Sequence, residues 1–187
     1  MTKTSILAKG LMAFLLVLSL GISARAAENL DPENTLYLDL KYGRVVIELY
    51  PRVAPRHVAR VKELVRQKFY DNLKFHRVID GFMAQTGDPL GNGRGGSGKK
   101  IRAEFSSIPH DRGIVSMARA SSPNSADSQF FIVLENSPHL NRKYSVFGKV
   151  VSGMEFVDQI KKGYGQGGQV RDPDIILRLR VAADVQQ

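Results

Sequence analysis

The chain has 187 residues, of which 43% are hydrophobic and 24% are charged, and its formal net charge is +9. This composition is typical of a globular protein that builds one core, and it excludes a chain that is disordered throughout. The chain contains no cysteine. Disulfides, zinc–thiolate sites, thiol nucleophiles and a lipid-modified cysteine are therefore excluded.

The first 26 residues have the pattern of a secretory signal peptide. Lys3 and Lys9 precede an apolar run over residues 11–20, which leads to the small-residue site Ala24-Arg25-Ala26. The run is shorter than the roughly 20 residues that a membrane-spanning helix needs. We therefore expect cleavage after Ala26, a mature domain over residues 27–187 and no stable membrane insertion after cleavage. The alternative is an uncleaved apolar segment, extending to Ile22, that acts as a membrane anchor.

The positive charge is spread along the chain. Removal of Lys3, Lys9 and Arg25 lowers the net charge from +9 to +6, and Lys and Arg alternate with Asp and Glu without a run of five like charges. This pattern is typical of a solvated surface, and no nucleic acid partner is expected. The alternative is a basic scaffold for anionic envelope surfaces, whose affinity would fall steeply with salt.

The mature chain begins with a predicted hairpin and a helix. Residues 36–49 alternate between apolar and polar around a turn over residues 41–44, and Gly43 supplies the turn. Pro55 then opens a helix. Apolar residues recur there at the spacing of one helical face, at Val58, Val61, Leu64 and Val65.

Short β-rich runs follow, separated by long glycine- and serine-rich loops of a kind that often carries function. The predicted strands cover residues 75–79, 82–85, 113–118, 129–133, 144–151 and 174–181. A capping box at Ser152–Glu155 predicts a short helix through Ile160. Many short strands with only two helices predict a mostly β domain, either a barrel or a sandwich.

Several short motifs imitate sites that the surrounding sequence does not support. Gly91–Gly96 matches G-x-G-x-x-G, but no helix is predicted after it, and Lys100 stands where a phosphate loop needs a hydroxyl. Ser116 lacks the glycines of a nucleophile elbow. We expect no cofactor and no metal, because none of the histidines has metal-binding spacing: His57, His76, His110 and His139.

Four stretches remain that can carry chemistry. Phe75-His-Arg-Val-Ile-Asp-Gly-Phe-Met-Ala-Gln-Thr-Gly-Asp88 is followed by Gly113–Ala118, Ser128-Gln-Phe-Phe-Ile132 and Tyr144–Gly148. In this order they closely resemble the cyclophilin family, over nearly all of the mature chain. The resemblance implies a closed eight-stranded antiparallel β-barrel capped by two α-helices. It also implies peptidyl-prolyl cis/trans isomerase activity.

The resemblance also implies a site. Arg77 is similar to the catalytic arginine of the family, while other positions resemble the walls of a proline pocket and the groups that hold the peptide. The implied walls are Phe82, Met83, Phe131 and Leu140, and His139 and Tyr144 lie at the rim. The implied peptide-holding groups are Gln85, Gln129 and the backbone at Ala118 and Arg119.

The residues themselves suit this chemistry. Rotation about a peptide bond meets a barrier of about 18–20 kcal/mol that comes from amide resonance, and a guanidinium is a permanently charged donor that favours the twisted amide. The alternative for Arg77 is a surface residue paired with Asp80 or Glu104, and for the phenylalanines an ordinary core. Strand spacing nevertheless groups Arg77 with Phe82, and Phe131 with Gln129.

Two departures from the family pattern concern the rim. Well-studied eukaryotic members have tryptophan where this chain has His139 and histidine where it has Tyr144, so weakened affinity for cyclosporin is expected. Bacterial cyclophilins resemble this variant pattern, which together with the predicted signal peptide indicates the periplasm. Arg119 replaces a common asparagine, but the family contact there runs through the backbone.

The leading hypothesis is a monomeric isomerase that acts on Xaa-Pro segments of unfolded or extended polypeptides. It would accelerate the folding of exported proteins, because uncatalysed prolyl isomerisation takes tens to hundreds of seconds. The alternative is a holdase that grips Pro-containing chains in the same apolar groove, with rotation incidental.

Overall fold

The computed structural model describes residues 30–185. It separates the chain into two units, Met1–Asp31 and Pro32–Gln187, and the fold below is that of the second unit. The predicted signal peptide lies outside the described residues. Among the described residues, no helix has both the length and the apolar character needed to cross a membrane.

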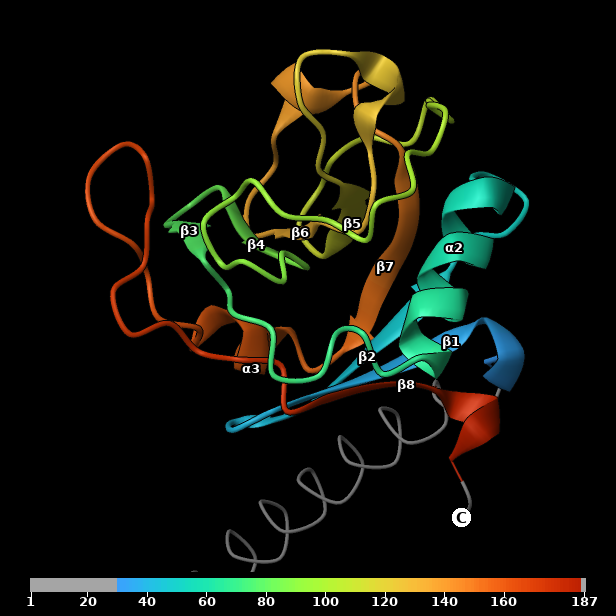
Figure 1. Cartoon of the computed structure of the whole chain (residues 1–187), viewed down its shortest axis with the longest axis horizontal. Coiled ribbons are helices and arrows are strands. Elements are labelled where there is room, and N and C mark those ends of the chain that lie inside the picture. Colours follow the sequence, from blue (N-terminus) through green and yellow to red (C-terminus); the bar gives the residue numbers. More distant parts are fainter. Residues whose placement is uncertain (1–29, 186–187) are drawn as a thin grey trace, which may run out of the picture. The chain divides into compact units, whose positions relative to one another are not determined.

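The described domain is built on one eight-stranded sheet in which all neighbouring strands are antiparallel (Figure 1). The strand order is β3-β4-β6-β5-β7-β2-β1-β8. The strands are β1 (Thr35–Leu40), β2 (Gly43–Leu49), β3 (Arg77–Ile79), β4 (Met83–Thr86), β5 (Ile114–Met117), β6 (Phe130–Val133), β7 (Val146–Ser152) and β8 (Arg178–Val181). Every predicted strand is confirmed, with ends that differ from the predicted ones by a few residues.

Two α-helices accompany the sheet, as predicted. Helix α2 (Pro55–Arg66) contacts β7 and β8, and α3 (Met154–Asp158) contacts β2. In Figure 1 they lie on opposite sides of β7 and β2. Short 3₁₀ turns occupy Pro32–Asn34, Pro123–Ser125, Pro138–Leu140 and Ala182–Asp184. The prediction of a mostly β domain with two helices is confirmed.

The closed barrel that was expected is corrected to an open, curled sheet. Strands β3 and β8 are its two edges and do not pair with each other. Irregular backbone over residues 163–177 lies along residues 72–78 instead. The Val78 N–H donates to the Gly168 carbonyl at 2.7 Å, and the Phe75 N–H donates to the Asp174 carbonyl at 2.8 Å. Four glycines and Pro173 in this segment disfavour a regular strand ladder.

Helix α2 begins at Pro55 as predicted, but its N-terminus is capped from far along the chain. Ala54 precedes the helix and offers no side-chain cap. The carboxylate of Glu104 accepts hydrogen bonds from the backbone N–H groups of Arg56 and His57, each at 3.1 Å. An anion at this position satisfies unpaired donors and complements the helix dipole.

The capping box predicted for α3 is wrong. Ser152 is the last residue of β7, and Gly153 precedes the helix with a φ of +85° and no side-chain cap. A Cβ on Gly153 would lie 2.5 Å from the Arg44 carbonyl oxygen, so only glycine fits. The helix ends at Asp158, two residues before the predicted Ile160.

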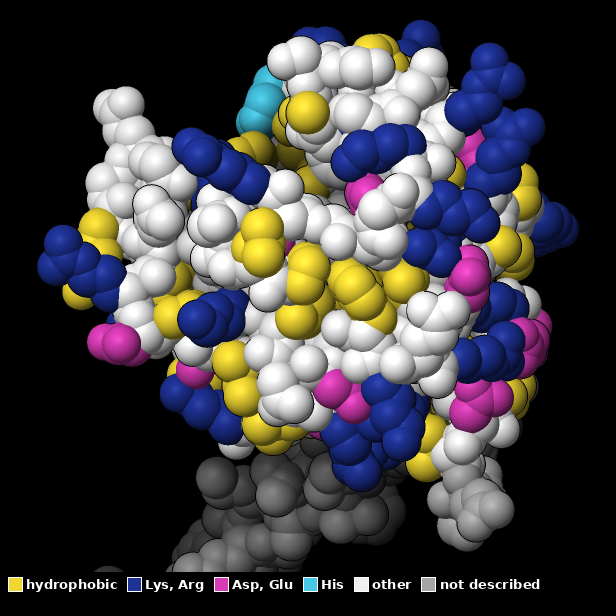
Figure 2. Space-filling model, viewed as in Figure 1, with side chains coloured by type: hydrophobic (Ala, Val, Ile, Leu, Met, Phe, Trp, Pro, Cys, Tyr) yellow, Lys and Arg dark blue, Asp and Glu magenta, His cyan; other side chains and the backbone are white. Residues whose placement is uncertain are grey.

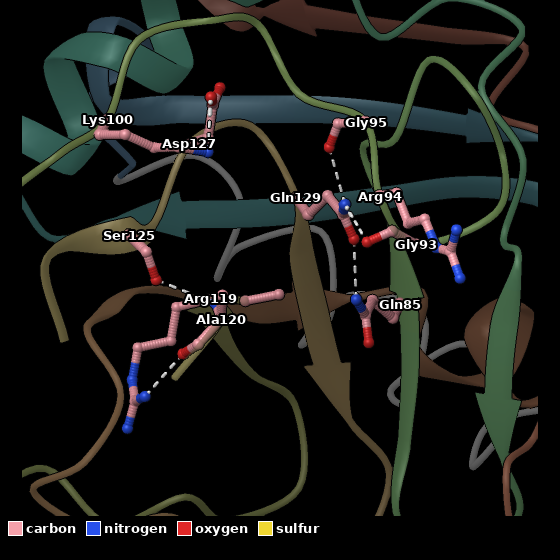
Figure 3. Close-up of a pocket in the computed structure, with 11 residues that line it drawn as sticks. Gln85, Gly93, Arg94, Gly95, Lys100, Arg119, Ala120, Ser125, Asp127 and Gln129 are labelled. Carbon is pink, nitrogen blue, oxygen red and sulfur yellow. Dashed lines mark hydrogen bonds and ion pairs between the residues drawn. The ribbon is translucent and has the colours of Figure 1, made fainter. Parts of the chain in front are cut away.

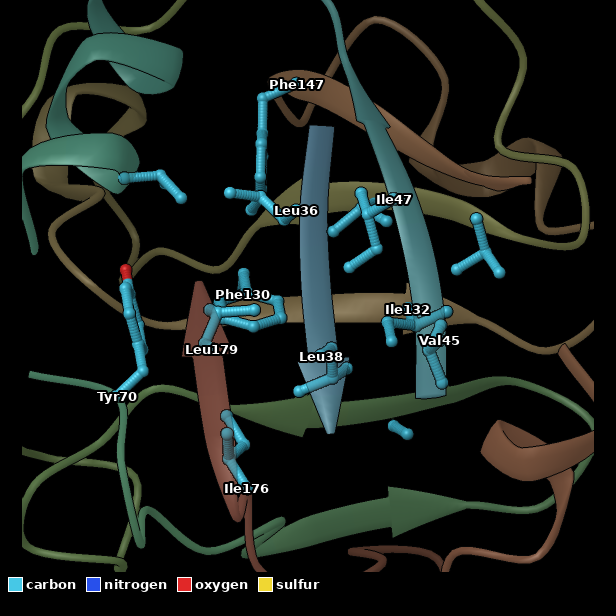
Figure 4. Packing of buried hydrophobic residues seen from close by; sticks show 14 of the residues in the cluster. Leu36, Leu38, Val45, Ile47, Tyr70, Phe130, Ile132, Phe147, Ile176 and Leu179 are labelled. Carbon is cyan, nitrogen blue, oxygen red and sulfur yellow. The ribbon is translucent and has the colours of Figure 1, made fainter. Parts of the chain in front are cut away.

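The main core lies on one face of the curled sheet (Figure 4). Alternate residues of β1 and β2 are buried there, among them Leu38 and Ile47. The ring of Phe130 meets Tyr70 and Phe147 edge-on, with centroids 5.5 and 6.0 Å apart. The buried Tyr70 hydroxyl donates to the Ser128 carbonyl at 3.0 Å, so the core carries no cost for an unsatisfied phenol there.

Three buried histidines make the stability of the domain depend on pH. Burial lowers the pKa of His57, His76 and His110 below the ordinary value of 6.5. For His57 this burial outweighs the nearby Glu104, to which its Nδ1 lies at 2.6 Å. The folded chain therefore holds these rings neutral at a pH where the unfolded chain binds protons.

We expect the free energy of unfolding to fall as the pH drops from 6.5 towards 5. The slope reaches up to about 1.4 kcal/mol per pH unit for each proton taken up on unfolding. Ionised carboxylates such as Glu104, whose pKa is lowered from 4.5, add their losses only at lower pH. Urea unfolding at several pH values measures the slope. His76→Leu should flatten it, and equal slopes for the two proteins would contradict the assignment.

Candidate active site

Strand β6 separates the main core from a second apolar cluster. Neighbouring residues of a strand point to opposite faces, so Phe130 joins the main core while Phe131 joins the second cluster. The buried members of the second apolar cluster are Met83, Ile114, Phe131, Val133, Leu140 and Val146. Partly buried hydrophobic residues pack against it, among them Phe82, Ala118 and Tyr144.

Aromatic side chains form the rim of this cluster. The Tyr144 ring lies edge-on to Phe131 with centroids 5.7 Å apart, and the exposed His139 ring lies 5.1 Å from Phe82. The Arg119 guanidinium stacks over Tyr144 at 4.7 Å. The two rim residues named from the sequence, His139 and Tyr144, thus contact residues of the second apolar cluster, and the side chain of Arg119, which was named for its backbone, lies beside them.

Arg77 lies in β3 at the edge of the cluster and pairs with no carboxylate in the part of the chain that the structure describes. Its Nε donates to the Gly167 carbonyl at 3.0 Å, and its Nη1 donates to the Gln85 side-chain oxygen at 3.2 Å and lies 3.8 Å from the Met83 sulfur. Burial lowers the pKa of Arg77, yet an arginine stays protonated at neutral pH. Within the described residues, Nη2 donates to no protein group.

The alternative reading of Arg77 as one half of a surface ion pair does not hold. Asp80 lies 3.9 Å from the Lys162 ammonium. Glu104 caps α2 and binds His57. Neither carboxylate contacts Arg77, so its charge is left for whatever occupies the site.

A chain of side-chain amides continues from Arg77 (Figure 3). Gln85 in β4 donates through Nε2 to the Gln129 side-chain oxygen at 2.9 Å. Gln129 in turn donates to the carbonyls of Gly93 and Gly95, at 3.0 and 2.8 Å. Each amide therefore has its orientation set by its neighbours, which holds the polar side of the site in place before a ligand arrives.

A cavity of about 380 Å³ lies beside these amides and is called the glutamine cavity here. Figure 3 shows Gln85 and Gln129 on one side of it and Arg119 with Ala120 on another. Its lining residues are Gln85, Gly93, Arg94, Gly95, Lys100, Ala118, Arg119, Ala120, Ser125, Asp127 and Gln129. Ala118 also packs against the second apolar cluster, so the apolar and polar parts of the site adjoin.

The glycine-rich loop is shaped around a carboxylate of the chain itself. Buried Asp88 accepts hydrogen bonds from the backbone N–H groups of Leu90, Asn92 and Gly93, at 2.8, 2.9 and 2.5 Å. Burial alone would raise the pKa of Asp88, but these N–H groups lower it overall. A Cβ on Gly95 would collide with Asp88. No helix follows the loop, so it builds the glutamine cavity rather than a phosphate site.

Sequence reasoning named every residue of the Arg77–Gln85–Gln129 chain but missed several others. Asp88 was not identified, although an aspartate just before a run of glycines is a signal for a side-chain-capped turn. The cluster residues Ile114, Val133 and Val146 were also missed, and two-residue alternation with Phe131 could have found Val133. Within residues 30–185, no group of three or more His, Asp or Glu side chains is arranged to hold a metal ion.

Comparisons with known proteins agree with this geometry. Residues 35–181 match the family model described as cyclophilin type peptidyl-prolyl cis-trans isomerase/CLD. A probable peptidyl-prolyl cis-trans isomerase of Brucella suis is 50% identical over 185 residues, which cover 92% of this chain and 94% of the relative. Peptidyl-prolyl cis-trans isomerase B of Bacillus subtilis is 48% identical over 132 residues, covering 69% and 92%.

Solved structures give the same result. A cyclophilin-type isomerase of Cryptosporidium parvum, crystallised in the presence of the dipeptide Ala-Pro, matches with a TM-score of 0.72 and 32% identity, covering 79% of this chain and 98% of that one. The family match spans the strands and loops that bring Arg77, Gln85 and Phe131 together. The chain therefore belongs to the cyclophilin-type peptidyl-prolyl cis-trans isomerases, class EC 5.2.1.8.

Proposed function

We propose that Arg77 lowers the barrier to prolyl isomerisation by stabilising the twisted amide. In the planar amide the nitrogen lone pair is delocalised into the carbonyl, and this resonance is lost when the bond rotates. The proline nitrogen then becomes a hydrogen-bond acceptor. A donor that is already positioned in a poorly solvated site stabilises this state more than water does. No covalent bond forms or breaks.

The observation that carries the proposal is the state of the Arg77 guanidinium. Nε and Nη1 are held by the Gly167 carbonyl and by Gln85, while Nη2 has no protein partner within the described residues. A guanidinium that is fixed through Nε and Nη1, and whose Nη2 hydrogens have no protein acceptor, is a preorganised donor. Its neighbour Met83 belongs to the second apolar cluster, which gives the proline ring a place within reach of the free donors.

The remaining site residues are proposed to hold the substrate. Phe82, Met83, Phe131 and Leu140 receive the proline ring. Gln85, Gln129 and the backbone at Ala118 and Arg119 bind the flanking peptide, for which the glutamine cavity supplies space. The family relationship, and the crystallisation of the Cryptosporidium parvum isomerase in the presence of Ala-Pro, support Xaa-Pro polypeptides as substrates.

A holdase that only grips Pro-containing chains is the alternative to be separated from catalysis. The test is refolding of a protein whose slow phase is prolyl isomerisation, with the full chain, Arg77→Ala and Phe131→Ala. The isomerase proposal expects both variants to lose the acceleration. The holdase alternative expects Phe131→Ala to lose the acceleration of refolding and Arg77→Ala to accelerate it to the same extent as the unchanged chain. In that case the function is binding without catalysis, and the role proposed for Arg77 is wrong.

We further propose that the protein is exported to the periplasm, where it acts as a monomer on the folding of exported proteins. The support is the charge and apolar pattern of residues 1–26 and the small-residue site at Ala24–Ala26. We expect the mature protein purified from the cell envelope to begin at Ala27. Intact-mass and N-terminal measurements check this, and an uncleaved N-terminus in the cytosolic fraction would contradict it.

Weakened affinity for cyclosporin is part of the same proposal. His139 is exposed and lies against Phe82 at the rim, where an indole would offer a larger apolar surface. The smaller polar imidazole buries less area against an apolar macrocycle. Replacement of His139 by tryptophan is therefore the substitution that should increase cyclosporin affinity.

A further inference from the structure

A second cavity, of about 370 Å³, lies between helix α2 and the loop that leads away from the glutamine cavity. It is called the arginine cavity here. Five cations line it, from two segments far apart in the sequence: Arg56, Arg60, Lys99, Lys100 and Arg102. Glu63 is the one acidic lining residue. Figure 2 shows dark blue side chains gathered on the side where α2 lies in Figure 1.

Three of these cations form no ion pair within residues 30–185. Arg60 is paired with Glu63 at 2.8 Å, and Lys100 lies 3.3 Å from Asp127. By contrast, no hydrogen bond or ion pair of the described residues involves the side chains of Arg56, Lys99 and Arg102, which are exposed. The arginine cavity therefore has an unbalanced positive charge that attracts an anionic ligand.

The composition of the cavity favours carboxylates on a flexible chain. Arginine forks bind carboxylates through two parallel hydrogen bonds, and Ala59 and Ile101 add apolar surface for the methylene groups of glutamate. The N-terminus of α2 contributes nothing, because Glu104 already occupies its N–H groups. The attraction comes from the side chains alone.

The arginine cavity shares a lining residue with the glutamine cavity. Lys100 lines both the arginine cavity and the glutamine cavity. Arg94 and Arg119 also line the glutamine cavity, so positive side chains follow the route from the second apolar cluster to α2. A polypeptide that leaves the proline site advances roughly 3.3 Å per residue when extended. The number of residues between the proline and the acidic side chains therefore decides which of them can meet the second cavity.

We propose that the arginine cavity binds acidic residues of the polypeptide substrate while its proline occupies the second apolar cluster. The enzyme would thus prefer Xaa-Pro segments that carry several Asp or Glu residues a few positions from the proline. The proposal rests on the proposed function only in placing the proline in the second apolar cluster. The Arg56, Lys99 and Arg102 side chains are specificity determinants and take no part in bond rotation.

The test compares peptides that share an Ala-Pro core and carry four glutamates or four glutamines, placed on either side of the proline behind spacers of two to six residues. Exposed ion pairs are individually weak, so we expect a KM roughly three- to tenfold lower for the glutamate peptide, with kcat unchanged. Raising the salt concentration should reduce the difference.

The decisive variant is R56Q/K99Q/R102Q in the full chain, and the matched control is R52Q/K68Q/K149Q. The control removes the same charge from exposed residues that line neither cavity. The first variant should lose the glutamate preference and the control should keep it, while both process the glutamine peptide normally. Equal loss in both, or no preference in the unchanged chain, overturns the proposal.

A binding measurement separates this proposal from the proposed function. Fluorescence anisotropy of a labelled glutamate peptide without proline reports on the arginine cavity even if no peptide is isomerised. Binding that R56Q/K99Q/R102Q weakens roughly tenfold supports the cavity. If the unchanged chain binds the glutamate peptide but isomerises no proline peptide, the proposed role of the second apolar cluster is wrong and the arginine cavity remains supported. Phosphatidylglycerol vesicles can compete for the same cations. If the vesicles displace the labelled peptide when they supply less negative charge than the peptide does, the surface binds membranes and the peptide assignment is overturned.

Discussion

Arg77→Ala should lower kcat/KM on an Ala-Pro peptide by roughly 10²–10³-fold, the range measured when one preorganised donor to a developing charge is removed from other enzymes. The loss should appear in kcat more than in KM, because the free donors of Nη2 meet the proline nitrogen only in the twisted state. Exchange between cis and trans peptide followed by NMR at equilibrium measures it directly.

Arg77→Lys separates the effect of the positive charge from that of the planar guanidinium with its several N–H donors. A lysine ammonium keeps the positive charge but cannot donate at once to the Gly167 carbonyl, to Gln85 and to the substrate. We expect it to recover less than a tenth of the lost turnover. Arg178→Ala, which removes an exposed arginine of β8, is the matched control and should keep full activity. Undiminished exchange by folded Arg77→Ala would refute the role of Arg77.

Phe130→Ala should lower the free energy of unfolding by about 3–5 kcal/mol, the range for removal of a buried aromatic ring from a core. The Phe130 side chain is 2% exposed and lies between the rings of Tyr70 and Phe147. The space it leaves cannot collapse easily, because β6 is held on both sides by β4 and β5. Urea unfolding monitored by circular dichroism measures the loss.

The neighbouring ring provides the comparison. Phe131 points to the opposite face of β6, into the second apolar cluster, so Phe131→Ala should raise KM for the Ala-Pro peptide. Phe130→Ala should leave KM unchanged at a temperature where it is still folded. A destabilisation by Phe130→Ala below about 1 kcal/mol would show that this ring does not support the core.

The strands and the long helix could be predicted because their signals are local. Two-residue alternation identifies buried Leu38 and Ile47, and Pro55 with a 3.6-residue apolar period identifies α2. The cap of α2 could not be predicted, since it comes from Glu104 nearly fifty positions later. The absence of pairing between β3 and β8 could not be predicted for a related reason: the resemblance implies a closed barrel, whereas the irregular path of residues 163–177 keeps the two edge strands from pairing.

Gly43 is a glycine for a second reason that the sequence pattern does not reveal. It was assigned to the hairpin turn, and it does follow the turn directly, at the first position of β2. A Cβ there would lie 2.6 Å from the ring of Phe156 in α3. The glycine therefore makes room for a helix that comes more than a hundred residues later. Turn propensity is a local property and cannot predict this contact.

The site residues likewise divide into those that local sequence signals predict and those that only the tertiary fold brings together. Arg77, Met83 and Gln85 lie on two consecutive strands, so their proximity follows from one hairpin and its register, in which Arg77 is opposite Gln85. The role of Asp88 and the shape of the glutamine cavity depend on the path of a loop without regular structure. The arginine cavity joins α2 to residues 99–102, and only the tertiary fold brings these segments together.

The irregular backbone over residues 163–177 also protects one edge of the sheet. A bare strand edge recruits extended polypeptides through main-chain pairing, with little regard to sequence, and it is a common starting point for aggregation. Here the outer side of β3 is already occupied by residues 168–170. The outer side of β3 is thereby protected from main-chain pairing with other polypeptides, and an extended substrate is directed to the side-chain and backbone groups of the candidate active site.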